Sequence, residues 1–243
     1  MFFFKKKSAA AADLGWLVAD MHSHLVPGID DGAQTLDASV QMIRGLKELG
    51  YQKLITTPHV LSDMYPNTPE TIGGGAERVR AELAQQGIDI AFGAAAEYYM
   101  DEFFEKKIKA REPLLTLSGN LVLVEYSMIT APMDLQELLF DLQMEGYQPV
   151  IAHPERYVYL SRRKEFFDEL RSAGCLFQLN LLSLTGHYGH SVQELAEYLM
   201  KGEFYDYAGT DMHSLRHLEL MQKLPAGPLN RLRDSGRIKN SGL

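Results

Sequence analysis

Five amphipathic helical patterns in this sequence each end at a glycine, and each glycine leads into an apolar run typical of a β-strand. In residues 37–49, for example, Val40, Ile43 and Leu46 share one helical face before Gly50. Glycine suits a helix end because it adopts the left-handed backbone conformation without a steric penalty. The other predicted helices and their terminal glycines are 69–86 with Gly87, 134–145 with Gly146, 162–173 with Gly174 and 191–201 with Gly202. The pattern therefore predicts helices that alternate with strands.

Seven apolar runs are the predicted strands, and they begin 27 to 37 residues apart, which is the length of one strand–helix unit. The runs are 16–22, 51–57, 88–97, 121–126, 148–153, 175–180 and 205–210. Such alternation predicts a parallel sheet covered by helices, either open and doubly wound or closed as a barrel. Because no linker rich in Pro, Gly or Ser divides the chain, we predict one α/β domain over residues 1–243, with residues 1–15 as a flexible N-terminal segment.

Composition narrows the class of protein further. The 243 residues carry a formal net charge of −8, which argues against a non-specific nucleic-acid-binding protein, since that function needs a basic face. The one cysteine, Cys175, excludes an intrachain disulfide and a cysteine-rich zinc site. No stretch approaches the roughly 18 apolar residues that a membrane span needs. These features predict a soluble cytoplasmic protein that neither binds nucleic acid nor spans a membrane.

Imidazole and carboxylate side chains gather at the C-terminal ends of the predicted strands, where parallel α/β folds bind their ligands. Because side chains alternate along a strand, His22 and His24 face the same way, and Asp211 and His213 repeat that spacing. The other candidates at these ends are Asp30, Asp31, His59, Glu97, Glu125 and His153. Nitrogen and oxygen donors without thiolate suit Mn, Fe, Zn or Mg, and their number favours two or more ions. The alternative is that they are scattered polar residues of loops.

Other hydrolytic chemistries lack their motifs. Six residues after Cys175 stands Leu181, where a cysteine phosphatase needs arginine. The sequence has no Gly-Lys pair for a phosphate-binding P-loop and no G-x-S-x-G motif of a serine hydrolase. Two or more divalent ions can stabilise both oxygens of an in-line displacement at phosphorus, so metal-assisted phosphoester hydrolysis is the predicted reaction class.

Seven separated motifs follow one another between residues 20 and 213. They are Asp20-Met21-His22-Ser23-His24, Pro27-Gly28-Ile29-Asp30-Asp31-Gly32, Thr57-Pro58-His59, Ala96-Glu97-Tyr98-Tyr99, Val124-Glu125-Tyr126-Ser127, Ala152-His153-Pro154-Glu155-Arg156-Tyr157 and Thr210-Asp211-Met212-His213. In this order they resemble the PHP (polymerase and histidinol phosphatase) superfamily, and within it the capsule-type bacterial protein-tyrosine phosphatases of the CpsB/YwqE family. The resemblance implies a distorted seven-stranded (β/α)7 barrel of the PHP type. It also implies three divalent ions, usually Mn²⁺, with Fe, Zn or Mg as alternatives.

The resemblance further implies which side chains bind each ion. It assigns the first ion to His22, His24, Glu97 and Asp211, the second to Glu97, Glu125 and His153, and the third to Asp31, His59 and His213. The residues alone do not decide between Asp30 and Asp31. Asp20 is expected to orient His22 or its neighbour.

Two arginines beside these motifs are candidates for phosphate contacts, since a guanidinium keeps its charge and its planar fork matches phosphate oxygens. Arg156 is predicted to be catalytic and to bind substrate, with a surface ion pair to Glu155 as the alternative. Arg216 is a second candidate for substrate binding, or it only covers the edge of the site. His217, on the next helix, is expected to be solvated.

The resemblance predicts a metal-dependent protein-tyrosine phosphatase whose substrate is the phosphotyrosine tail of a bacterial tyrosine kinase that controls capsule or exopolysaccharide synthesis. The alternative enzyme is a small-molecule phosphomonoesterase such as histidinol phosphatase, which shares the superfamily's fold and metals. An amidohydrolase is disfavoured because Glu125 stands where those barrels place a lysine. A catalytically silent scaffold is disfavoured because silent relatives usually lose ligands, and none is missing here.

Overall fold

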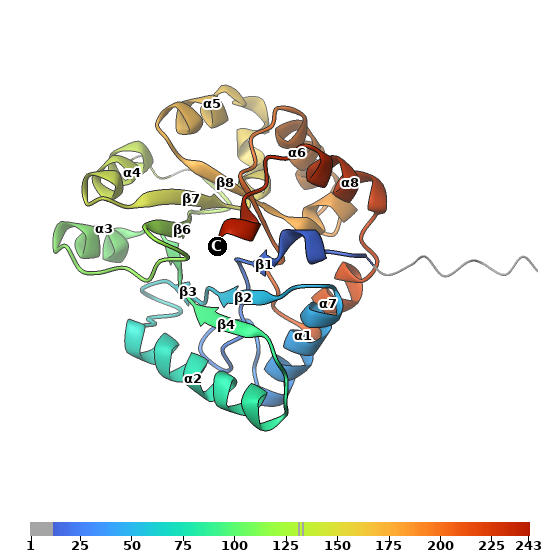
Figure 1. Cartoon of the computed structure of the whole chain (residues 1–243). Coiled ribbons are helices and arrows are strands. Elements are labelled where there is room, and N and C mark those ends of the chain that lie inside the picture. The colour runs from blue at the N-terminus through green and yellow to red at the C-terminus, as the bar shows by residue number, and fades with distance from the viewer. Residues whose placement is uncertain (1–11, 131, 133) are drawn as a thin grey trace, which may run out of the picture.

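The computed structural model describes residues 12–130, 132 and 134–243, and its strands form a ring with the helices on the outside (Figure 1). The strands are β1 Ala19–Asp20, β2 Lys53–Thr56, β3 His59–Val60, β4 Ala91–Ala94, β5 Glu97–Tyr99, β6 Leu121–Glu125, β7 Gln148–Ala152, β8 Leu176–Asn180 and β9 Tyr207–Gly209. The α-helices are α1 Leu36–Glu48, α2 Pro69–Gln85, α3 Glu102–Lys109, α4 Leu135–Met144, α5 Glu165–Ser172, α6 His190–Lys201, α7 Leu215–Met221 and α8 Ala226–Asp234. Short 3-10 helices are η1 Gly15–Leu17, η2 Pro154–Arg156, η3 Val158–Arg162, η4 Leu181–Thr185 and η5 Asn240–Gly242.

The strand pairs of the described residues are parallel, as the alternation with helices predicts. One sheet has the order β1-β2-β4 and the other has the order β3-β5-β6-β7-β8-β9. The sheets continue into each other, because the chain passes from β2 to β3 and from β4 to β5 with only two residues between. The Glu97 N–H donates to the Pro58 carbonyl at 3.1 Å, so pairing persists across this interruption. The predicted α/β class, with parallel strands at seven positions, is confirmed for the described part of the chain.

The first and last strands of the ring meet at their C-terminal ends. Ser23 and Met212 form a parallel bridge, and the Asp211 N–H donates to the His22 carbonyl at 2.8 Å. At the other end of this seam, the buried Asn240 side chain donates to the carbonyls of both β1 and β9, and its oxygen accepts the Ala208 N–H. The C-terminal segment therefore lies at the centre of the ring (Figure 1).

Alternation along the strands separates two apolar clusters, one inside the ring and one between strands and helices. In β6, Leu123 belongs to the inner cluster, whereas Val122 and Val124 belong to the outer one. Glu125 has the same parity as Leu123, which turns its carboxylate toward the interior of the ring. The inner cluster fills the ring with side chains, so polar chemistry is confined to the strand ends. Its members are Met21, Ile55, Ala95, Leu117, Leu123, Val150, Ala152 and Tyr207.

Four of the five predicted glycine helix ends have a left-handed backbone. Their φ angles are 104° at Gly50, 63° at Gly87, 88° at Gly146 and 86° at Gly174. Gly202 differs, because its φ is −78° and the positive φ falls on Glu203 instead. Glycine is needed at position 202 for space, since a Cβ there would lie 2.7 Å from the Phe204 ring.

The predicted flexible segment, residues 1–15, divides into two parts. Residues 1–11 lie outside the described residues. Residues 12–15 differ from the expectation, because Leu14 is fully buried and its N–H donates to the Leu49 carbonyl at 2.8 Å. Across the part of the chain that the structure describes, every helix is too short or too polar to span a membrane.

Candidate metal centre

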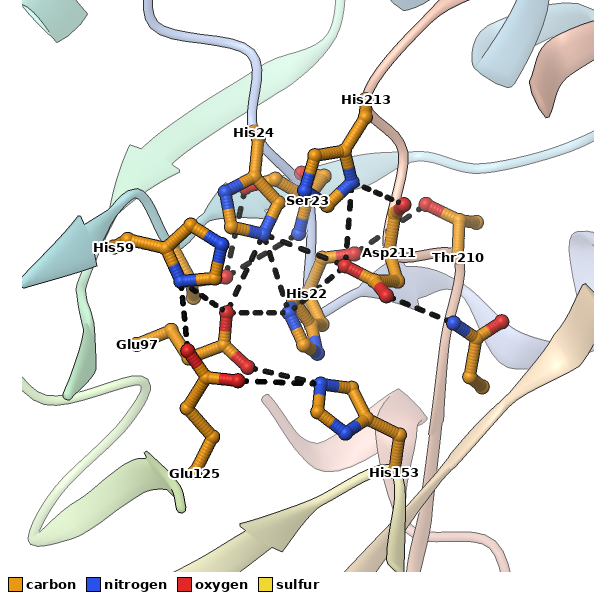
Figure 2. Close-up of polar contacts among 12 residues, drawn as sticks. His22, Ser23, His24, His59, Glu97, Glu125, His153, Thr210, Asp211 and His213 are labelled. Carbon is orange, nitrogen blue, oxygen red and sulfur yellow. Dashed lines mark hydrogen bonds and ion pairs between the residues drawn. The ribbon is translucent and has the colours of Figure 1, made fainter. Parts of the chain in front are cut away.

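The imidazoles and carboxylates predicted from the sequence converge at the C-terminal end of the strand ring (Figure 2). The strands β3, β5 and β6 begin or end on His59, Glu97 and Glu125, and His153 follows β7 directly. Nitrogen and carboxylate oxygen atoms within each of four overlapping groups lie within 4.8 Å of one another. The groups are His24, Asp31, His59 and His213; His22, His24 and Asp211; His22, Glu97 and His153; and His59, Glu97 and Glu125.

Glu97 occupies the centre of the cluster and is fully buried. Its Oε2 atom lies 3.2 Å from His22 Nε2, 3.4 Å from His24 Nε2 and 3.1 Å from His59 Nδ1. Its Oε1 atom lies 3.1 Å from His153 Nε2. Oε2 nevertheless makes no hydrogen bond to any residue that the structure describes. A buried carboxylate oxygen without a hydrogen bond is costly, and three imidazole nitrogens around it are the donor set of a divalent cation. The residues therefore fit a metal centre.

Asp211 binds the cluster through one oxygen and the surrounding protein through the other. Its Oδ1 atom lies 3.2 Å from His22 Nε2 and 3.4 Å from His24 Nε2. Its Oδ2 atom accepts hydrogen bonds from Arg156 Nη1 at 3.1 Å and from Asn180 Nδ2 at 2.8 Å. This division leaves Oδ1 directed at the imidazoles.

Two of the candidate ligands hold backbone conformations that side chains with a Cβ rarely adopt. The φ angles are 32° at His153 and 50° at Asp211. Each residue directly follows a strand of the ring or lies two residues beyond one. Strained conformations of this kind concentrate at functional sites, where the surrounding structure holds them. Here they turn both side chains inward as the chain leaves the strand.

The structure distinguishes Asp30 from Asp31. Asp30 is buried, and its Oδ2 atom accepts from His24 Nδ1 at 2.8 Å and from the His59 N–H at 3.2 Å. Asp31 is half exposed, and its Oδ1 atom lies 3.5 Å from His59 Nε2 and 3.4 Å from His213 Nε2. Asp31 thus faces the cluster as a ligand would, whereas Asp30 orients the His24 ring.

The opposite charges of the cluster shift its titrations strongly. Burial alone raises the pKa of Glu97, but His22 and His59 hold it well below its usual range. Burial likewise disfavours the charged form of His59, yet Glu97 and then Glu125 raise its pKa to about 10. Without a cation, protons therefore neutralise this anionic centre. A divalent ion would replace those protons, since metal ligands must be deprotonated.

A cavity of about 560 Å³ opens over the cluster and reaches several of the candidate ligands. Its remaining wall is largely apolar and aromatic, and includes Leu61, Met64, Tyr65, Tyr99, Met128 and Tyr188. The Tyr65 ring stacks on His59, with ring centroids 5.6 Å apart and an interplanar angle of 14°. Such a cavity can admit a flat aryl group with its polar end toward the ligands.

The two predicted substrate arginines lie in different places. Arg156 lines the cavity, where its guanidinium lies 4.7 Å from the centroid of the Tyr188 ring and donates to Asp211. It does not pair with Glu155, which is buried and accepts hydrogen bonds from other residues. Arg216 is not brought to the cavity, because it lies on the exposed side of α7 and pairs with Glu219 at 2.6 Å. The one-turn geometry of α7 directs it outward.

Two further expectations need correction. His217 is not simply solvated, because it lines the cavity and its Nδ1 atom accepts from the His213 N–H at 3.4 Å. Asp20 does not contact the His22 ring, because both of its oxygens accept from Thr210. The His22 ring is instead bonded by Gln178, whose Oε1 lies 2.9 Å from His22 Nδ1. A sequence search limited to ionisable residues misses Gln178, and its place on the strand facing the cluster is the signal that points to it.

Comparisons with known proteins agree with this geometry. Residues 18–222 match the family model described as capsular polysaccharide synthesis, CpsB/CapC. The tyrosine-protein phosphatase CpsB of Streptococcus agalactiae is 30% identical over 204 residues, which cover 81% of this chain and 83% of that protein. The tyrosine-protein phosphatase YwqE of Bacillus subtilis is 27% identical over 197 residues, which cover 81% of this chain and 78% of that protein.

Solved structures give the same result. A chain from the crystal structures of YwqE from Bacillus subtilis and CpsB from Streptococcus pneumoniae, described as metal-dependent tyrosine phosphatases, superposes with a TM-score of 0.76 at 25% identity, and the match covers 89% of this chain and 94% of that one. The lactonase Lmo2620 from Listeria monocytogenes shares the fold alone, with a TM-score of 0.53, 11% identity and coverage of 96% of this chain and 94% of that one. From the family match over residues 18–222, we conclude that this chain belongs to the CpsB/CapC family.

Proposed function

We propose that this protein is a metal-dependent protein-tyrosine phosphatase that hydrolyses phosphotyrosine in proteins. The observation that carries the proposal is the buried, unbonded Oε2 atom of Glu97, which three imidazole nitrogens surround at 3.1 to 3.4 Å. The names of the CpsB and YwqE relatives support the choice of phosphotyrosine over other phosphate esters.

We propose three divalent ions as the cofactor, with Mn²⁺ as the metal and Fe, Zn or Mg as alternatives that suit the same donors. His22, His24, Glu97 and Asp211 would hold the first ion, Glu97, Glu125 and His153 the second, and Asp31, His59 and His213 the third. The overlap of the observed groups at His24 and Glu97 supports adjacent ions that share ligands. When bound, such ions polarise a phosphate ester and supply a water nucleophile near neutral pH.

Arg156 is the proposed catalytic and substrate-binding side chain of the protein itself. Its guanidinium would donate to phosphate oxygens and stabilise the charge that develops on them. The Asp211 carboxylate and the Tyr188 ring hold it at the cavity wall, so little side-chain freedom is lost when substrate binds. Arg216 has no such support, and its role as a second substrate contact is not part of the proposal.

The cavity wall suits the leaving group of phosphotyrosine. Tyr65 and Tyr99 line it beside the imidazoles, so an aryl ring can pack between aromatic faces while its phosphate meets the cluster. The tyrosinate that departs has a pKa of about 10, and its release therefore needs no strong general acid.

We also propose the cellular setting. The tyrosine-rich tail of a bacterial tyrosine kinase in capsule or exopolysaccharide synthesis is the proposed substrate, acting in the cytoplasm. The family's description as capsular polysaccharide synthesis supports this partner. The chain would act as one phosphatase domain, which the continuous outer core of the described residues supports.

The test compares turnover of a phosphotyrosine peptide, p-nitrophenyl phosphate and histidinol phosphate by the purified protein. We expect hydrolysis of both aryl phosphates, loss of it after chelation and recovery on addition of Mn²⁺. Arg156→Ala should lower kcat about 100- to 1,000-fold with metal retained, whereas the matched control Arg216→Ala should remain near wild type. Selective hydrolysis of histidinol phosphate would support the alternative function. Turnover that resists complete removal of metal would overturn the proposal.

A further inference from the structure

Strand β8 differs from its neighbours in the ring, because its sequence Leu176–Asn180 contains neither an imidazole nor a carboxylate. Its two polar side chains, Gln178 and Asn180, are nevertheless fully buried. They have the same parity along the strand, and each makes a hydrogen bond to a candidate metal ligand. Two buried amides at the centre of a polar cluster need an explanation beyond packing.

The orientation of the Gln178 amide is determined by the backbone around it. Its Oε1 atom accepts the His153 N–H at 3.3 Å, and its Nε2 atom donates to the Leu179 carbonyl at 2.6 Å. The atom that faces His22 Nδ1 at 2.9 Å is therefore an acceptor. Consequently, His22 Nδ1 must carry the proton.

A proton fixed on His22 Nδ1 leaves Nε2 as the nitrogen with a free lone pair when the ring is neutral. This Nε2 atom lies 3.2 Å from Glu97 Oε2 and 3.2 Å from Asp211 Oδ1, which is the ligand side of the ring. Close packing keeps the arrangement in place, because a Cβ on Gly209 would lie 2.7 Å from His22 Cβ and 2.8 Å from Gln178 Nε2.

Asn180 acts on Asp211 in the same way. Its Oδ1 atom accepts the Leu182 N–H at 2.9 Å, so the atom that faces Asp211 is the amide nitrogen. That nitrogen donates to Asp211 Oδ2 at 2.8 Å, and Arg156 donates to the same oxygen. With Oδ2 occupied by two donors, Oδ1 is the oxygen that remains for a cation. Asn180 also bonds the hydroxyl of Tyr188, whose ring packs on Arg156.

We propose that Gln178 and Asn180 are positioning residues of the metal centre: Gln178 selects the metal-binding tautomer of His22, and Asn180 selects the metal-binding oxygen of Asp211. The inference rests on the proposed metal-dependent function. Neither amide touches an ion or a substrate. Outer partners of this kind commonly alter metal affinity about 10- to 100-fold when they are removed.

The first test measures Zn²⁺ affinity by competition with a chromophoric chelator. Gln178→Leu should weaken binding about 10- to 100-fold, whereas Gln178→Glu should stay within a few-fold of wild type, because a carboxylate accepts the same His22 N–H. Gln148→Leu is the matched control, since Gln148 begins β7 and its amide bonds the Gly174 carbonyl away from the cluster. Unchanged affinity in Gln178→Leu would overturn the role of Gln178.

The second variant separates the two roles of Asn180. Asn180→Asp keeps an oxygen to accept the Leu182 N–H but places a carboxylate 2.8 Å from Asp211 Oδ2 in place of the donor. A purely structural role would leave metal binding intact, whereas the proposal expects Zn²⁺ affinity to fall at least about 10-fold. Affinity equal to or above that of wild type would contradict it.

Nitrogen NMR of the Zn²⁺-loaded wild-type protein tests the tautomer directly and does not depend on a folded variant. We expect a protonated Nδ1 and a metal-bound Nε2 on His22, and the reverse assignment would overturn the proposal for Gln178. If the wild-type protein binds neither Zn²⁺ nor Mn²⁺, the proposed function itself fails. If it binds metal and the variants bind equally well, only the positioning roles fail.

Discussion

Removing the metal should make the stability of this protein fall as the pH rises. His59 carries the argument, because burial opposes its charge while Glu97 and Glu125 raise its pKa to about 10. In an unfolded chain the same imidazole titrates near 6.5. A raised folded pKa contributes stability that is complete below the unfolded value and is lost as the pH rises through the folded value.

The size of the effect follows from the two pKa values. Between pH 6 and pH 9, His59 alone should remove about 3 kcal/mol from the free energy of unfolding. Its side chain is only 15% exposed, so solvent screening reduces this value little. His22 and His24 also have raised pKa values, which adds to the loss with the same sign.

The assay is urea unfolding of the chelator-treated protein at pH 6 and pH 9, followed by the fluorescence of Trp16. Glu97→Gln provides the internal comparison, because Glu97 is the largest of the influences that raise the pKa of His59. The variant should show a much smaller difference between the two pH values. A metal-free protein that is equally stable or more stable at pH 9 would refute the reasoning. So would an unchanged pH dependence in Glu97→Gln.

Three further predictions concern the frame of the site. Gly209→Ala forces a Cβ to within 2.7 Å of His22 Cβ, so it should cost about 1–3 kcal/mol in thermal unfolding and lower metal content; an unchanged melting temperature would contradict this. Asn240→Ala leaves backbone groups of β1 and β9 unpaired and should destabilise by about 1–3 kcal/mol in urea, unlike the exposed control Asn230→Ala. Burial raises the pKa of Cys175 to about 12, so iodoacetamide at pH 8 should modify the folded protein far more slowly than the unfolded one, and equal rates would show that the thiol is accessible.

Much of the fold could be predicted from periodicity, because local rules govern it. Glycine closes α1, α2, α4 and α5, and the apolar runs between them became parallel strands. The interruption between β2 and β3 is also local in origin, since Pro58 has no N–H and the Thr57 N–H donates to the Ser23 carbonyl instead. Gly202 shows the limit, because its role depends on the packing of Phe204, which no helical pattern contains.

The candidate ligands were predictable for two separate reasons. The alternation of side chains and the C-terminal strand ends indicated His22, His24 and Asp211, and the motif resemblance then assigned the ions. Choosing between Asp30 and Asp31 required three dimensions, because adjacent residues in a loop have no fixed period and only the fold turns Asp31 toward His213.

The remaining errors arise where tertiary structure decides direction. Arg216 lies three residues after His213, but α7 begins at Leu215 and turns Arg216 outward to Glu219 while His217 reaches the cavity. Gln178 and Asn180 carry no charge, so no search for metal-ligating residue types finds them. Their importance follows only from the hydrogen bonds that link β8 to His22 and Asp211.

Metal content measured against recovered activity tests the central claim most directly. The purified protein is stripped with a chelator, titrated with Mn²⁺ and analysed at each step for bound metal by elemental analysis and for turnover of a phosphotyrosine peptide. The account predicts that activity is absent in the stripped protein and returns as two to three ions bind per chain, in keeping with the overlapping ligand groups of the cluster. A protein that binds no Mn²⁺, or one that hydrolyses the peptide equally well without it, would contradict the account.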